Sequence, residues 1–136
     1  MEEALAAFRD TAQGHRLPHL SEVLQRWSGD DGPTLRPPAE PTALVNDWGH
    51  AAARLDCWAL WACVDGFGLP RDQDAEGFAL WPLSRLVLAA DIDGGRHVRS
   101  HDPAMVVFAD YLGWCWAYAI AVDGQSADYG AVFLIG

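Results

Sequence analysis

The sequence contains no lysine, and its nine basic residues, all arginine, stand against nineteen acidic residues. The resulting net charge of -10 argues against binding to nucleic acid phosphates, because such binding needs cations that displace the counterions. A basic protein partner would be attracted instead. The absence of lysine also excludes a P-loop, in which a lysine reaches the nucleotide phosphates.

Long apolar runs and paired cysteines are missing too. No apolar run reaches the roughly 18–20 residues of a membrane span, and residues 1–3 are acidic where a signal peptide is basic. We therefore expect a soluble, cytoplasmic protein. Cys57, Cys63 and Cys115 are odd in number and lie in apolar runs, so they predict small buried side chains and no disulfide framework or zinc site.

Motifs of known chemistry are weak or absent. His97 and His101 are four residues apart, but the glycines before them and Pro103 after them favour strand and loop, and no HExxH glutamate is present. Gly66 and Gly68 lack the third glycine of a dinucleotide fingerprint and follow a predicted helix, whereas that motif follows a strand. The chain has no G-x-S-x-G elbow and no zinc deaminase signature. We expect no catalytic residues, no metal and no cofactor.

The first half of the chain predicts helices within a single domain that spans residues 1–136. Apolar residues at helical spacing predict helices over 2–13, from Pro18 to Gly29, and from Thr42 to about Val64. Four prolines between residues 32 and 41 predict an extended loop on the domain surface.

The second half predicts strands over 77–81, 105–109, 114–122 and 131–135, whereas 84–89 fits either a helical turn or a strand. In 114–122 bulky and small apolar residues alternate, which predicts a central strand with Trp116 and Tyr118 buried. Helices followed by strands predict an α+β fold, in which N-terminal helices pack against a mainly antiparallel sheet built from the C-terminal half.

Acidic residues gather between positions 65 and 93. This part of the chain contains six carboxylates against two arginines: Asp65, Asp72, Asp74, Glu76, Asp91 and Asp93, with Arg71 and Arg85. Such a segment is either a solvated loop, its charge a by-product of a composition rich in alanine, arginine, glycine and aspartate, or an electrostatic docking surface.

Four short segments together resemble the SUKH superfamily, which includes fungal Smi/Knr-type cell-wall regulators and many bacterial immunity proteins. They are VDGFGLP at 64–70, FALWPL at 78–83, VFADYL at 107–112 and WAYAI at 116–120. The resemblance covers roughly residues 55–135 and implies an α+β fold that binds proteins without catalysis. Members often end in a further helix. This chain stops at Gly136, directly after a predicted strand, which leaves open what covers the apolar residues 133–135 and makes a homodimer through that edge one expectation.

These observations lead to a functional hypothesis. The chain is predicted to be a non-enzymatic immunity protein that occludes the surface of a cognate bacterial toxin, with a basic nuclease-type toxin as the partner and no nucleic acid or membrane bound. Aromatic anchors would lie at the centre and acidic groups at the rim. The alternatives are a small-ligand-binding or regulatory domain, and an enzyme with an unfamiliar site. The predicted partner-binding residues are Asp65, Phe67, Asp72, Asp74, Glu76, Trp81, Asp110, Tyr111 and Trp114.

Overall fold

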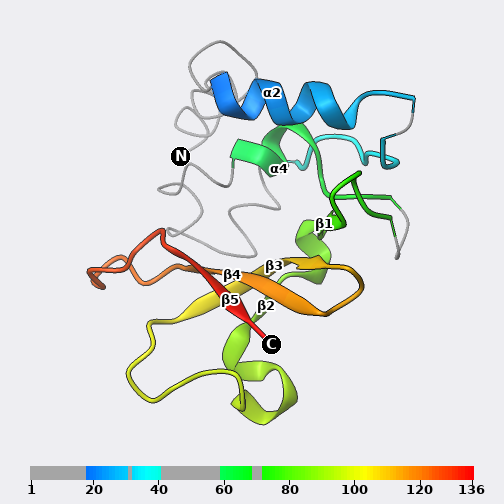
Figure 1. Cartoon of the computed structure of the whole chain (residues 1–136). Helices are drawn as coiled ribbons and strands as arrows, with labels where there is room; N and C mark the ends of the chain where they lie inside the picture. The colour runs from blue at the N-terminus through cyan, green and yellow to red at the C-terminus, as the bar shows by residue number, and fades with distance from the viewer. Residues whose placement is uncertain (1–17, 31, 41–58, 69–71) are drawn as a thin grey trace.

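A computed structural model describes residues 18–30, 32–40, 59–68 and 72–136, and this part of the chain is built around one antiparallel sheet (Figure 1). The strands are β1 (Phe78–Leu80), β2 (Val87–Leu88), β3 (Met105–Tyr111), β4 (Trp116–Ala121) and β5 (Val132–Ile135). Their order is β1-β3-β4-β5, and β2 pairs with β3 on the same side as β1. The predicted antiparallel sheet from the C-terminal half is therefore confirmed.

Helix is a minor part of the described structure. The α-helices are α2 (Pro18–Trp27) and α4 (Ala59–Cys63), and the 3-10 helices are η3 (Leu83–Arg85), η4 (Ala89–Asp91) and η5 (Asp93–Gly95). The helix predicted after Pro18 is thus confirmed, and α4 matches the end of the one predicted to Val64. The rest of that helix, and the helix predicted over 2–13, lie outside the described residues. None of the described helices has the length and apolar character that a membrane crossing requires.

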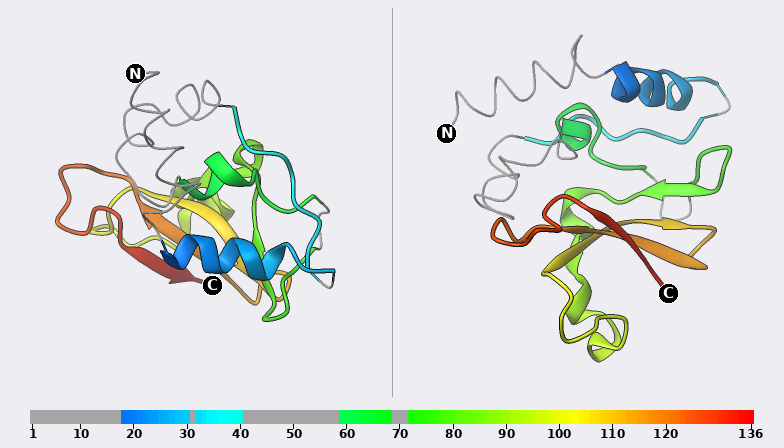
Figure 2. Two further views of the ribbon diagram at one scale, coloured as in Figure 1. Left: turned by 90° about the horizontal axis from the view of Figure 1, so that it is seen from above. Right: turned by 60° about the vertical axis from the view of Figure 1, so that its left-hand side comes forward.

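The sheet separates two groups of helices. Both α-helices lie on one side of it, and η4 and η5 lie on the other (Figures 1 and 2). Trp27, at the end of α2, is buried; its ring meets the Phe67 ring edge-on at 5.0 Å and stacks on the Phe78 ring at 5.9 Å. Phe67, predicted to bind a partner, is therefore a core residue.

The central strand β3 carries an irregularity that shapes the site. Its register with β4 shifts between Val107 and Ala109, so Phe108 is an additional, bulged residue. On the opposite side of β3 the edge is interrupted: β1 pairs with residues 109–111, β2 pairs with residues 106–107, and residues 81–86 leave the sheet between them. The backbone N–H of Trp81 still donates to the Phe108 carbonyl at 2.9 Å. The interruption therefore places Trp81 and η3 beside the bulge.

The alternation in β4 is partly confirmed. Ala117, Ala119 and Ala121 are fully buried, as expected for the small face of a covered strand. The strand begins at Trp116, however, because the preceding residues form a turn, and Trp116 is 36% exposed at the end of the sheet. The prediction that Trp116 is buried in mid-strand is wrong, whereas Tyr118 is half-buried.

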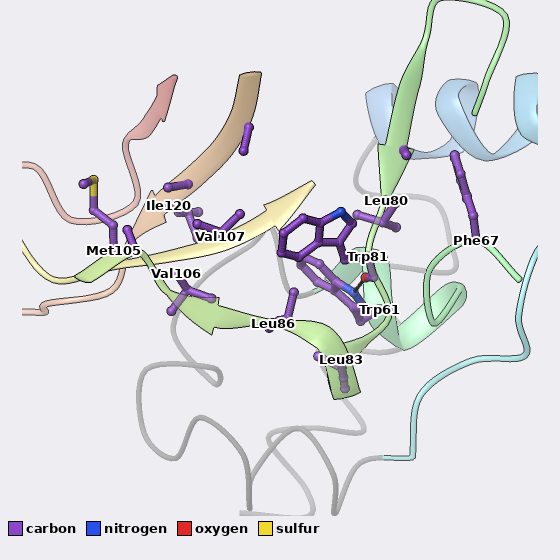
Figure 3. Close-up of a cluster of buried hydrophobic side chains, with 14 of the residues drawn as sticks. Trp61, Phe67, Leu80, Trp81, Leu83, Leu86, Met105, Val106, Val107 and Ile120 are labelled. Carbon is purple, nitrogen blue, oxygen red and sulfur yellow. Dashed lines mark hydrogen bonds between the residues drawn. The ribbon is translucent and has the colours of Figure 1, made fainter. Parts of the chain in front are cut away.

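The core is dominated by large side chains that converge from the sheet and from α4. Trp61, Leu80, Val106 and Val107 are the largest fully buried side chains, and Trp61 and Leu80 lie beside the buried Trp81 (Figure 3). The Trp61 indole Nε1–H donates to the Trp81 carbonyl at 2.8 Å. This bond satisfies a buried donor and fixes the backbone where the chain leaves the sheet.

The proline-rich segment is tied to the chain around α4. The N–H of Ala39 donates to the Trp61 carbonyl at 2.8 Å, and the N–H of Gly68 donates to the Thr34 carbonyl at 2.6 Å. The chain then passes close to the sheet at Gly66. There φ is +77°, and a Cβ would lie 2.6 Å from the Trp81 carbonyl carbon. Only glycine fits both the left-handed conformation and the close approach of the two backbones.

Candidate functional site

The turn between β3 and β4 displays a group of large apolar side chains. Leu112 is 49% exposed, Trp114 is 39% exposed, and both lie close in sequence to the exposed Trp116. The Trp116 ring stacks on the half-buried Tyr111 ring, with centroids 4.2 Å apart and planes 12° apart. We call these four residues, Tyr111, Leu112, Trp114 and Trp116, the turn surface. Neighbouring exposed apolar side chains of this size are typical of interaction sites.

The backbone of this turn is strained. Leu112, Gly113 and Trp114 have φ of 46°, 63° and 78°, and the left-handed region costs a residue with a Cβ about 1–2 kcal/mol. Hydrogen bonds hold the turn in place: the Leu112 N–H donates to the Gly77 carbonyl at 2.9 Å, and the Cys115 N–H donates to the Tyr111 carbonyl at 3.0 Å. Strain of this kind is found at ligand-binding sites more often than elsewhere.

The strained turn brings Trp114 against a cluster centred on Trp81. The Trp114 and Trp81 ring centroids are 5.3 Å apart. The Arg85 guanidinium carbon lies 4.0 Å from the Trp81 ring centroid, which is a cation–π contact. The Trp81 indole Nε1–H donates to Asp110 Oδ2 at 2.7 Å. Arg85 reaches this position because η3 follows Pro82 and turns the chain back over Trp81.

A pocket of about 400 Å³ opens between this cluster and the acidic segment, and we call it the turn pocket. Its lining includes Asp72, Gln73, Arg85, Asp110 and Trp114. Its volume is at the lower end of the roughly 300–1,000 Å³ typical of ligand pockets. A second hollow of about 240 Å³ shares Asp72 and Arg85 with it. The pocket therefore combines carboxylates, a guanidinium and an aromatic ring.

Asp110 is the most buried charged residue among the described residues that line the pocket. It is 5% exposed, and its Oδ2 accepts the hydrogen bond from Trp81. In the part of the chain that the structure describes, its second oxygen, Oδ1, accepts no hydrogen bond. A buried carboxylate has about four lone-pair sites, so a single donor leaves most of them unsatisfied.

Most of the other predicted acidic residues serve as acceptors within the fold. Asp74 accepts from the Trp27 indole N–H at 3.1 Å and from the backbone N–H groups of Glu76 and Phe78 at 2.9 and 3.0 Å. Asp65 Oδ1 accepts from the Leu83 N–H at 2.8 Å. These two carboxylates fix loops against the core, away from the turn pocket.

Asp72 and Glu76 differ from them. Asp72 Oδ2 accepts from the Thr34 N–H at 2.8 Å, and the side chain also lines the turn pocket. Glu76 is exposed, with Arg26 at 3.8 Å. Of the nine predicted partner-binding residues, the structure brings Asp72, Asp110 and Trp114 together at the turn pocket with Trp81 behind them. It places Tyr111 in the adjoining turn surface and leaves Asp65, Phe67, Asp74 and Glu76 apart.

The histidine pair is separated from this site. His97 Nε2 lies 3.4 Å from Asp93 Oδ2, and His101 is exposed. A group of three or more side chains able to hold a metal ion is not found among the residues that the structure describes.

Four of the residues named at the site were not predicted from the sequence: Gln73, Arg85, Leu112 and Trp116. Arg85 could have been found, since Trp81-Pro82 starts a turn that returns the chain after about four residues. Leu112 and Trp116 gave no such signal, because their exposure depends on where β4 begins. Cys115 was predicted to be buried but is exposed within the same turn, with its Sγ 3.6 Å from the Leu112 carbonyl oxygen.

Comparison of the chain with protein-family models, with curated proteins and with solved structures gave no match. The function therefore has to be inferred from the turn surface and the turn pocket themselves.

Proposed function

We propose that the chain is a non-enzymatic protein-binding module that contacts its partner through the turn surface. The observation that carries this proposal is the exposure of Leu112, Trp114 and Trp116 on a strained turn that hydrogen bonds hold in place. Aromatic side chains are enriched in the centres of protein interfaces and supply much of their binding energy. Because the turn is held before binding, little conformational entropy is lost when a partner docks.

The partner that fits best is a basic toxin in the cytoplasm, which the chain would neutralise as an immunity protein. The net charge of -10 and the resemblance of residues 55–135 to the SUKH superfamily both support this proposal. As part of this proposal, N-terminal helices pack against the sheet, as the resemblance implies. The β3–β4 turn would then remain free for the partner. The toxin would be inhibited by occlusion of its surface, without any reaction.

The negative charge of the protein acts mainly on the rate at which the partner associates. Exposed carboxylates such as Glu76 and Asp91 attract a basic surface over a distance set by the salt concentration. That distance falls from about 10 Å at 0.1 M salt to about 3 Å at 1 M. The aromatic residues of the turn surface, in contrast, determine how long the complex persists.

The experiment first tests whether a neighbouring reading frame encodes a toxin domain, and then measures binding kinetics against that domain. We expect Trp116→Ala to raise the dissociation rate at least tenfold, because an exposed aromatic anchor is lost. Leu88→Ala, at a second apolar residue that is also 36% exposed, is the control and should change nothing. Raising the salt from 0.1 to 1 M should slow association of the wild type. Equal dissociation rates for the two variants would contradict a role of the turn surface.

A small-ligand domain is the second candidate, and the turn pocket is the observation that favours it. The pocket contains a buried carboxylate and an aromatic ring, as many ligand sites do. Binding of a small metabolite with no protein partner would support this alternative.

A further inference from the structure

We propose that the turn pocket receives a guanidinium group, the side chain of an arginine on the partner protein. The inference rests on the proposed protein-binding function and adds the chemistry of one contact. It assigns Asp110 as the acceptor of the incoming group and Trp114 as the ring on which that group packs.

The first argument is the unsatisfied carboxylate. Asp110 Oδ1 has no hydrogen-bond donor among the described residues, although Asp110 is only 5% exposed and lines the pocket. A group that fills the pocket must therefore bring donors. A cationic donor suits a buried carboxylate better than a neutral one, because bonds between ionised partners are roughly twice as strong.

The second argument is the balance of charge. Asp72 and Asp110 supply two carboxylates to the pocket, and Arg85 supplies one guanidinium. Asp72 uses only Oδ2 within the described part of the chain, for the Thr34 N–H. The described residues of the lining therefore have a net negative charge, like the protein as a whole, and favour a cation over an anion.

The third argument selects arginine over lysine. Arg85 already packs its guanidinium on the Trp81 ring at 4.0 Å, and the neighbouring Trp114 offers a second, exposed ring to the pocket. A planar guanidinium stacks on an indole and presents several N–H donors in a fork, whereas an ammonium is a compact, strongly hydrated charge. The pocket is thus suited to a planar cation.

The positive charge of Arg85 makes the direction of one mutational effect diagnostic of the ligand. This charge repels a second guanidinium, so its removal should strengthen binding of an arginine side chain. If the pocket instead held a carboxylate or a zwitterion, Arg85 would be an essential partner and its removal would weaken binding. The effect of one substitution therefore separates the two chemistries.

The test uses the full chain and two capped tripeptides, acetyl-Gly-Arg-Gly-amide and the same peptide with citrulline, which has the shape of arginine without its charge. Binding is followed by NMR through the indole N–H signals, one of which is assigned to Trp114 by its loss in Trp114→Phe. We expect the arginine peptide to bind at least tenfold more tightly than the citrulline peptide. Asp110→Asn, which keeps an acceptor for the Trp81 indole, should weaken binding of the arginine peptide about tenfold. Arg85→Gln should tighten it.

Equal affinity for the two peptides, or weaker binding of the arginine peptide by Arg85→Gln, would overturn the proposal. Neither result requires Asp110→Asn to fold. The toxin experiment separates this inference from the proposed function. If Asp110→Asn binds the toxin like the wild type while Trp116→Ala does not, the guanidinium contact is refuted and the protein-binding function stands. If the arginine peptide binds and the toxin does not, the pocket assignment stands without its partner.

Discussion

At the residue scale, the carboxylates of this chain divide into those that hold the fold and those that face solvent. Asp74 accepts three hydrogen bonds, including one from the buried Trp27, whereas Glu76, two residues later, is exposed and has only a distant arginine. The two residues carry the same charge but contribute differently to the stability of the fold, and the sequence alone does not show this difference.

We therefore expect Asp74→Ala to lower the free energy of unfolding by about 1–3 kcal/mol, because it leaves donors near the core without a partner. Glu76→Ala should change it by less than about 0.5 kcal/mol, as is usual for exposed sites with weak ion pairs. Urea unfolding of both variants decides this, and similar losses would show that the Asp74 bonds contribute little. A joint neutralisation of Asp72, Asp74 and Glu76 would mix stability with association, so Glu76→Gln alone is the cleaner test of charge.

At the element scale, the connection from α4 to the sheet depends on backbone contact at Gly66. Gly66 and Gly94 share a left-handed conformation, with φ of +77° and +69°. A Cβ on Gly66 would strike the backbone of residues 81 and 82, whereas one on Gly94 would have no neighbour within 4 Å.

Gly94→Ala should therefore lower the free energy of unfolding by about 1–2 kcal/mol, which is the cost of placing a residue with a Cβ in the left-handed conformation. Gly66→Ala should cost about 1–3 kcal/mol more, because the two backbones must separate. The difference between the two melting temperatures measures the steric part alone. Equal shifts would mean that the contact at Gly66 relaxes without cost.

The strands show what the sequence can and cannot predict. Pro82 closes β1 where expected, and the alternating alanines of β4 are buried as expected, because both signals are local. The start of β4 could not be predicted: the alternation continues back to Trp114, while Leu112 and Trp114 adopt positive φ that their residue types disfavour. Trp81 contacts Asp110 and Trp114, which both lie far from it in the chain, so no spacing in the sequence indicates the pocket.

At the scale of the whole molecule, two surfaces are candidate interfaces: the turn surface and the edge strand β5. Strand β5 is the last in the sheet order and pairs with β4. Its Val132 and Leu134 are exposed, Leu134 to 65%. An apolar edge of this kind promotes pairing between copies unless charge opposes it.

We expect copies of the chain to associate through β5, and we expect high salt to favour this association, since it screens the repulsion between two copies of charge -10. Light scattering of the protein at tens of micromolar, in about 0.1 M and 1 M salt, should give a larger mass at the higher salt concentration. Leu134→Glu should restore the monomer mass in both. A monomer in every condition would leave the turn surface as the sole candidate interface among the described residues.

The β3–β4 turn displays large apolar side chains at Leu112 and Trp114, and at Trp116, the first position of the strand that follows. The sheet beneath is specified by other residues, mainly buried alanines and valines that never reach this surface. Natural variation could therefore exchange the displayed side chains, one after another, without disturbing strand pairing. Under the proposed protein-binding function, such exchanges would alter the choice of partner while the scaffold stays constant.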